Sequence, residues 1–304
     1  MLPYLAVIAS SLIWTVASQM FAHLGREISV IKLSFYKALI ACTLFTLVGF
    51  TLFGSDAIVP FPIALMLICS GILGYAFADL MVFNSFAKLG PARTMVFVSF
   101  GPLLLAIEGY LFLDERLTIS QIIGIFFMLL CLIFLSQDKN LKLKTKVEGR
   151  ANTPVKILLI AGLGVLLDSF GVILSKKSFI YAAEINFPLN SITANIYRTL
   201  FPILVVAIIA YFNNRSLSLK HHKRKDLWLI IISTFLGTFM ALSLYLYAIS
   251  KENPAIISAM ACMSPIYASI YEHWRDKILP SKNFIVAIIF MLVGLLLGLK
   301  LINF

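Results

Sequence analysis

Charged side chains are scarce in this sequence. Asp, Glu, Lys and Arg make up only 13% of the chain, against roughly 25% in an average soluble domain. Hydrophobic residues make up 61%, and the mean hydropathy is +0.97. Apolar stretches of about 20 residues, the length that crosses a bilayer as a helix, recur throughout the chain. The composition leaves no room for a sizeable soluble domain and predicts an integral, polytopic membrane protein.

Cysteine is rare as well. The four cysteines all fall inside apolar segments, where neither a disulfide framework nor the CxxC spacing of a metal site is available. They are Cys42, Cys69, Cys131 and Cys262. We interpret them as small buried hydrophobic side chains, and the sequence predicts neither a metal nor a cofactor.

Recognised catalytic motifs are lacking. The sequence contains no Gly-x-x-x-x-Gly-Lys pattern for ATP phosphates, no His-Glu-x-x-His and no Gly-x-Ser-x-Gly. We therefore expect a protein that is not an enzyme, although a polytopic membrane enzyme or sensor without transport activity remains the alternative. A passive channel would favour a continuous polar stripe on several helices, whereas the polar residues here are isolated.

The net charge of +11 is explained by the position of the basic residues relative to the membrane. Most of the Lys and Arg residues sit in short loops between apolar spans, so we expect anionic lipid head groups, and no nucleic acid, as their partner.

Breaks at charged residues, Gly and Pro divide the chain into ten apolar spans. Their length and uniform hydropathy predict helices and not the alternating strands of a membrane barrel. The predicted fold class is an all-α membrane protein with ten transmembrane helices. They lie at about 4–22, 30–53, 61–86, 92–113, 118–136, 155–175, 190–212, 227–250, 255–273 and 283–302.

The two halves of the chain resemble each other. The stretch LGYAFADLMVFNSFAKLGPARTMVFVSFGPLLL from Leu73 aligns without gaps on LGTFMALSLYLYAISKENPAIISAMACMSPIYA from Leu236. Earlier in each half, FYKAL from Phe35 resembles IYRTL from Ile196. The aligned pairs include Gly74 with Gly237, Lys88 with Lys251, Pro91 with Pro254 and Pro102 with Pro265.

These matches predict two five-helix units. Five is an odd number, so the second unit must cross the membrane in the opposite sense to the first, which is the geometry of an inverted repeat. We predict a first repeat at 1–136, a basic linker at 137–154 and a second repeat at 155–304, with a central cavity between the repeats.

Several stretches together resemble one known family. Asp79 is followed by FNSFAKLGPAR, then by a helix carrying Pro102 and by LFLDERLTISQIIGIFFMLLCLIFL. This pattern resembles the EamA-type members of the drug/metabolite transporter superfamily over nearly the whole chain, most specifically from Asp79 to Gly124. In the second half, WRDKILPSKNF stands where the acidic turn would be.

The resemblance implies a carrier rather than a particular substrate. Such proteins move small metabolites, among them amino acids, through a cavity shared by the two halves. We therefore expect a secondary transporter of the bacterial cytoplasmic (inner) membrane that moves amino acids or related amines by alternating access, as a proton-coupled carrier or a uniporter.

Asp79 is the first candidate for a functional site. A charge near the bilayer centre costs about 2.5–3.5 kcal/mol on insertion scales, so it needs a partner, a wet cavity or a neutral form. Asp79 shares a helical face with Tyr75 and Phe83, and such an aromatic surface with one carboxylate suits an amine. The alternative to a substrate or proton site is a salt bridge to Lys37 that holds two helices together.

Other polar groups in the apolar spans complete the candidate set. Lys37 and Arg198 occupy matched places in the repeat, and we expect both to be structural. Glu108 lies near a helix end, where its side chain could reach the interface at little cost. In the eighth span, Thr238 and Tyr245 lie on the face that matches Asp79. The candidate substrate-binding residues are Trp14, Tyr75, Asp79, Phe83, Asp168, Thr238 and Tyr245.

Proline and glycine mark two further features. Pro102 and Pro265 each lack a backbone donor, and we expect them to bend their helices. Gly294 and Gly298 form a seam of small residues in the last span. This seam is expected either to pack the two halves together or to form a homodimer contact.

Two arguments about membrane orientation disagree. The loops after odd-numbered spans carry most of the Lys and Arg residues, so the positive-inside rule favours both termini outside. The family resemblance favours both termini in the cytoplasm, and the sequence leaves both orientations open.

Overall fold

The computed structural model describes residues 1–89, 98, 100–136, 155–219, 223–264, 266, 267, 270 and 281–298. Within these residues every regular element is helical, which confirms the all-α class. The predicted linker at 137–154 and Pro265 lie outside the described residues.

The first half contains two long helices, one interrupted helix and two shorter helices. The interrupted helix carries a π-helical segment in its middle. In chain order the elements are α1 (Leu2–Glu27), α2 (Val30–Phe53), the short η1 (Gly54–Ala57), α3 (Phe61–Gly71), the π segment η2 (Ile72–Ala78), α4 (Asp79–Leu89), α6 (Gly101–Leu113) and α7 (Ile119–Ser136).

The second half repeats this plan. Its interrupted helix also carries a π segment. The elements are α9 (Val155–Glu184), α10 (Ser191–Phe212), α11 (Arg224–Ser233), the π segment η3 (Thr234–Ala241), α12 (Leu242–Lys251), α13 (Pro254–Ala261) and α15 (Lys282–Gly298). Described helix therefore occupies at least part of every predicted span.

Six helical stretches of the described residues are long and apolar enough to cross a membrane. They are Leu2–Gly25, Val30–Ala57, Phe61–Ser85, Leu159–Glu184, Ser191–Phe212 and Arg224–Lys251. Three further apolar helices are shorter: Gly101–Leu113, Ile119–Cys131 and Lys282–Gly298. The chain is an integral membrane protein with multiple apolar helices.

Helix α9 is considerably longer than the sequence predicted. The span predicted to end at about residue 175 continues as α9 to Glu184. The prediction stopped there because Lys176 and Lys177 follow, yet Lys176 is buried and donates hydrogen bonds to two backbone carbonyls. A lysine with partners does not end a helix.

The two π segments lie at matched places in the repeat. Gly74 and Gly237, which the sequence aligns with each other, lie inside η2 and η3 respectively. π-Helical turns are rare, and they occur frequently at functional sites. Each half therefore carries the same local departure from α-helical geometry.

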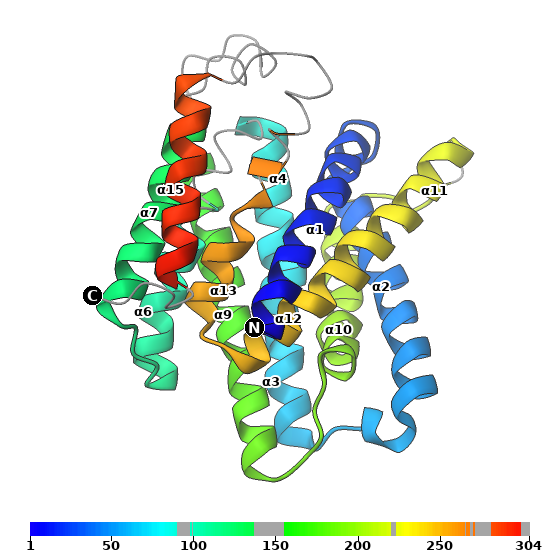
Figure 1. Cartoon of the computed structure of the whole chain (residues 1–304). Helices are drawn as coiled ribbons and strands as arrows, with labels where there is room; N and C mark the ends of the chain where they lie inside the picture. The colour runs from blue at the N-terminus through cyan, green and yellow to red at the C-terminus, as the bar shows by residue number, and fades with distance from the viewer. Residues whose placement is uncertain are drawn as a thin grey trace.

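Equivalent helices of the two halves pack against each other. α2 contacts α10, α6 contacts α13, and α7 contacts α15. Figure 1 shows that α2 and α10 run in opposite directions, as do α7 and α15. The first helix of each half packs on the interrupted helix of the other: α1 on η3 and α12, and α9 on α3, η2 and α4. This reciprocal pattern is consistent with duplicated halves.

The glycines of the last span, Gly294 and Gly298, pack against α7 of the same chain. A Cβ atom on Gly294 would lie 2.8 Å from the carbonyl oxygen of Gly124, and one on Gly124 would lie 2.9 Å from the backbone nitrogen of Gly298. The absence of side chains lets α7 and α15 approach closely. Of the two expectations for this seam, packing between halves is the one observed, and the seam offers no surface to a second copy.

Candidate functional site

Four charged side chains gather around the π segment η2. Lys37 comes from α2, Asp79 opens α4, Asp168 lies near the middle of α9, and Arg198 comes from α10. Asp168 lies within electrostatic range of each of the other three. All four helices contact η2, so both halves contribute charges to one cluster.

Lys37 and Asp79 form an ion pair. The lysine side chain is 3% exposed and the aspartate 25% exposed. A buried ammonium needs an opposite charge, since its desolvation is otherwise uncompensated. The pair joins α2 to α4, which is the salt-bridge geometry considered for Asp79, and it leaves part of the carboxylate accessible.

Aromatic rings enclose the ammonium of this pair. Lys37 Nζ lies 5.9 Å from the ring centroid of Phe21, 5.7 Å from that of Tyr75 and 5.3 Å from that of Phe83. Such distances are those of cation–π contacts. The aromatic and acidic face expected to bind a ligand amine thus surrounds an amine of the chain itself.

Arg198 is held by polar groups on α3 and α10. Its Nε donates to Ser70 Oγ at 3.0 Å, and its Nη1 donates to Asn195 Oδ1 at 3.3 Å. Its guanidinium carbon lies 4.8 Å from the centroid of the Tyr75 ring. Tyr75 in turn donates its hydroxyl to Asn195 Oδ1 at 3.4 Å. The guanidinium is fixed in place on one face of η2.

Asp168 differs from the other charges because its side chain is exposed. A Cβ atom on Gly74 would lie 3.4 Å from Oδ1 of Asp168 and 3.9 Å from Nη2 of Arg198. The acid and the guanidinium therefore both approach the same glycine of η2. The exposed carboxylate and the buried guanidinium therefore lie at the same glycine and within electrostatic range of each other.

The remaining candidates lie toward the second half. Trp14 packs on η3, where a Cβ atom on Gly237 would lie 3.2 Å from its ring. Thr238 is buried, and its hydroxyl has no hydrogen-bond partner among the described residues. Tyr245 is half-buried and lies within electrostatic range of Asp168. The structure brings Tyr245 near the charged cluster, whereas Trp14 and Thr238 lie along the π segment of the other half.

The expectation that Glu108 reaches the membrane interface is wrong. Its side chain is only 4% exposed, and its Oε1 lies 2.7 Å from the hydroxyl oxygen of Ser169 on α9. Packing of α6 against α9 covers the acid, and sequence reasoning could not foresee which face of the span would be covered.

Pro102 and Pro202 occupy different places in their helices. Pro102 was predicted in the middle of a span, but it falls in the first turn of α6, where a missing N–H costs nothing. Among the described helices, Pro202 in α10 is the proline in a helix interior, and the sequence analysis did not single it out. Because Pro202 has no N–H, the carbonyl of Arg198 four residues earlier loses its helical donor.

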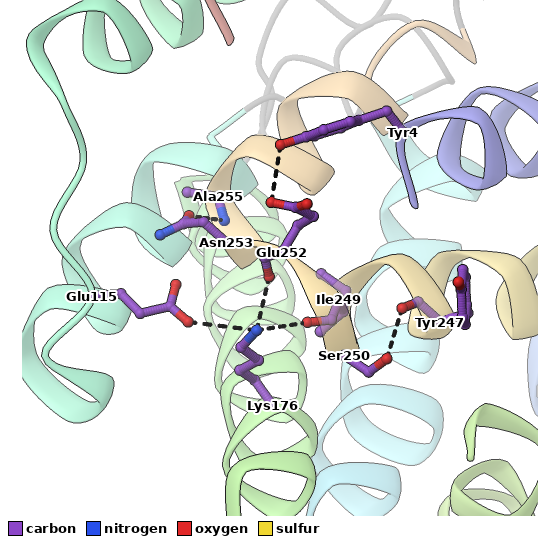
Figure 2. Close-up of polar contacts among 9 residues, drawn as sticks. All are labelled: Tyr4, Glu115, Lys176, Tyr247, Ile249, Ser250, Glu252, Asn253 and Ala255. Carbon is purple, nitrogen blue, oxygen red and sulfur yellow. Dashed lines mark hydrogen bonds and ion pairs between the residues drawn. The ribbon is translucent and has the colours of Figure 1, made fainter. Parts of the chain in front are cut away.

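A second polar cluster joins the halves at the end of α12 (Figure 2). Lys176 Nζ donates to the carbonyls of Ile249 at 3.0 Å and Glu252 at 2.9 Å, and it lies 3.6 Å from Oε1 of Glu115. Tyr4 donates its hydroxyl to Oε2 of Glu252 at 2.9 Å. Residues of α1 and of the loop after α6 are thereby linked to α9 and α12.

Sequence reasoning missed this cluster, and it also missed Ser70 and Asn195 beside Arg198. Asn195 was detectable, because it lies three residues before Arg198 and so on the same helical face. Lys176 and Glu252 could not be detected in this way. They lie far apart in the sequence, on α9 and directly after α12, and each looks like an ordinary charged residue of a loop.

Glu115 lies in the loop between α6 and α7. Burial raises the pKa of Glu115 above its usual value, and the Lys176 ammonium acts in the opposite direction. Its second carboxylate oxygen, Oε2, is buried with no hydrogen-bond partner among the described residues. The carboxylate is therefore only partly compensated by its lysine.

The fold and the cluster define a class: a helical integral membrane protein of two matched halves, with charges from both halves meeting at its centre. The chain belongs to the EamA-like transporter family, whose sequence profile matches residues 1–137 and 156–299. The resemblance expected from the sequence is thereby confirmed.

A solved structure shares the fold. One described as "Crystal structure of protein" superposes with a TM-score of 0.77 at 14% sequence identity, covering 98% of this chain and 96% of that chain. At this identity the likeness concerns the fold alone. No curated protein matches the chain.

Proposed function

We propose that the protein is a secondary carrier that moves amino acids or related amines by alternating access. Membership in the EamA-like family supports a transporter over a membrane enzyme or sensor. The observation that carries the substrate class is that exposed Asp168 and the buried guanidinium of Arg198 both approach Gly74 and lie within electrostatic range of each other. A carboxylate and a guanidinium side by side match the ammonium and carboxylate of an amino acid.

The position of Asp168 supports a cavity. It lies near the middle of an apolar helix that is long enough to cross the membrane. A charge exposed to lipid there would cost several kcal/mol, so polar groups at this depth face the bundle interior or water. The exposed surface of Asp168 accordingly belongs to a hydrated path shared by the two halves.

The paired π segments support the mechanism. η2 contacts α2, α4 and α10, which are the helices that carry Lys37, Asp79 and Arg198. η3 is the equivalent π segment of the second half. Segments with weakened helical bonding can change conformation at modest cost. In this proposal the halves form an inverted repeat in a bacterial inner membrane, and the interrupted helices bend at η2 and η3 as access alternates.

Counterflow in proteoliposomes tests the proposal. Wild type is loaded with unlabelled compound and offered a panel of labelled amino acids and small amines. Saturable exchange of at least one compound is expected, with the compound recovered unmodified. Uptake that rises linearly with concentration would indicate a channel, a modified product would indicate an enzyme, and no exchange of any panel member would overturn the substrate class.

Two variants refine the same assay. Asp168→Asn removes the charge assigned to the substrate and is expected to lower exchange at least tenfold. Asp56→Asn removes an exposed acid in η1 outside the cluster and is expected to leave exchange unchanged. Equal exchange by both variants would contradict the assignment of Asp168.

A further inference from the structure

Glu108 is a buried acid that the charged cluster does not use. It lies on α6 of the first half and faces α9 of the second half. Its Oε1 lies 2.7 Å from Ser169 Oγ, whereas its Oε2 is buried and has no hydrogen-bond partner among the described residues. A serine hydroxyl is thus the one polar partner that the described residues give this carboxyl group.

Counting protons around Ser169 shows which form of Glu108 fits. The serine oxygen lies 2.7 Å from the carboxyl group and 2.9 Å from the carbonyl oxygen of Leu166. A hydroxyl has one proton, and a backbone carbonyl can only accept. With an ionised Glu108, Ser169 must share its single proton between the carboxylate and the Leu166 carbonyl. With a neutral Glu108, the acid donates to Ser169 and Ser169 donates to Leu166, so each contact has its own proton and the neutral acid satisfies the site better.

Among the described residues, no Lys or Arg forms an ion pair with Glu108. Among the described elements packed on α6, α9 brings the acid Asp168 within electrostatic range. Residues 254–261 of α13 contain no ionisable side chain. The loop after α6 brings Glu115, whose Cβ would lie 4.0 Å from a Cβ atom built on Gly109, and Glu115 is paired with Lys176 of α9 at 3.6 Å. A buried carboxylate beside Asp168, with one oxygen unpartnered and no cation in contact with it among the described residues, is disfavoured.

We propose that Glu108 is a proton-binding site and that its proton couples transport to the proton gradient. The inference rests on the proposed carrier function and names the coupling residue. Glu108 and Ser169 belong to different halves, so their contact opens when the halves move apart. In water a glutamic acid titrates near 4.3, so an opened Glu108 releases its proton at neutral pH. It binds a proton again when the opposite side opens and the contact re-forms.

Asp79 has a different role in this scheme. It forms an ion pair with Lys37. The first candidate of the sequence analysis is therefore not the residue that carries the proton. The proton resides instead at an interface between halves, where its release changes how α6 and α9 pack.

Infrared spectroscopy tests the protonation state without any substrate. Purified protein in lipid at pH 7 is expected to show the C=O stretch of a protonated carboxylic acid, and Glu108→Gln is expected to lack it. Ser169→Ala should keep the band but shift it, because the acid loses its hydrogen-bond partner. Glu184→Gln, at an exposed glutamate at the end of α9, is the matched control and should leave the band unchanged. A Glu108→Gln spectrum in which the band is no weaker than in wild type would overturn the proposal, whereas a smaller residual band can come from the partly buried Glu115.

Transport then tests coupling. Wild type should respond to an imposed pH gradient, and Glu108→Gln should keep counterflow exchange while its rate no longer depends on the gradient. If wild type exchanges no compound, the carrier function fails, and the infrared result still decides whether Glu108 is neutral. If wild type exchanges but Glu108→Gln retains the gradient response, the carrier function stands and the coupling role of Glu108 is refuted.

Discussion

The backbone carbonyl of Arg198 occupies the place where a side chain on Gly71 would begin. A Cβ atom built on Gly71 would lie 1.9 Å from that oxygen, well inside any allowed contact. The same carbonyl has lost its helical donor because Pro202 stands four residues later. Gly71 and Pro202 together let α3 and α10 touch through their backbones, directly beside the side chain of Arg198.

Gly71→Ala should therefore prevent the normal packing of α3 on α10. The clash is with backbone, which cannot rotate away as a flexible side chain can. We expect a loss of several kcal/mol and little or no monodisperse protein in detergent, measured by size-exclusion chromatography and thermal unfolding. Gly25→Ala is the control, because a Cβ atom there would meet nothing within 4 Å. Equal stability of the two variants would contradict the close contact.

The Lys37–Asp79 pair should show a reciprocal rescue. Lys37→Met leaves a carboxylate without its cation, and Asp79→Leu leaves a buried ammonium. Each single change should destabilise the protein by about 3–5 kcal/mol. The double variant should recover most of that loss, because no uncompensated charge remains. Thermal unfolding of the four proteins gives the coupling energy, and additive effects of the two substitutions would show that the pair is not energetically linked.

Lys176 should matter far more than its neighbour Lys177. Lys176 is buried and donates to the carbonyls of Ile249 and Glu252, whereas Lys177 is exposed. Lys176→Met leaves two carbonyls at the end of α12 without their donor, at about 1–3 kcal/mol for each buried unpaired group. Its melting temperature should fall clearly below that of Lys177→Met, and similar melting temperatures would refute the role of this cluster in joining the halves.

Glu115 gives a pH dependence with a definite sign. Burial raises its pKa in the folded protein, so the unfolded chain releases this proton at lower pH than the folded one. The stabilising contribution of the neutral acid is complete below the unfolded pKa and is lost as pH rises through the raised folded value. Gln does not ionise, so the Glu115→Gln variant does not lose this stability as the pH rises. The melting temperature of Glu115→Gln relative to wild type should therefore increase with pH over that interval, and a constant difference would contradict the raised pKa.

Much of the fold was predictable because it depends on local and periodic signals. The apolar spans give the helices, and the alignment of Gly74 with Gly237 marks the places where both π segments occur. The end of α9 was not predictable, because Lys176 extends the helix only through contacts with α12. Such contacts depend on which helices become neighbours.

The sequence predicted which residues belong to the candidate site, but not which of them contact one another. Intramembrane charge identified Lys37, Asp79, Asp168 and Arg198, which the structure brings around one π segment. Their partners come from the packing of four helices. For the same reason Glu108 was expected at the interface and is found buried between the halves.

The central claim is that Asp168 faces a hydrated path and not lipid. Cysteine labelling tests it most directly, in a background in which Cys42, Cys69, Cys131 and Cys262 are replaced by Ala or Ser. Leu163→Cys is the control, because Leu163 is also exposed on α9 but lies five residues away, about 140° around the helix. A charged, membrane-impermeant thiol reagent should modify Asp168→Cys in proteoliposomes and leave Leu163→Cys unmodified. An unreactive Asp168→Cys, in protein whose thiols react fully after denaturation, would contradict the account.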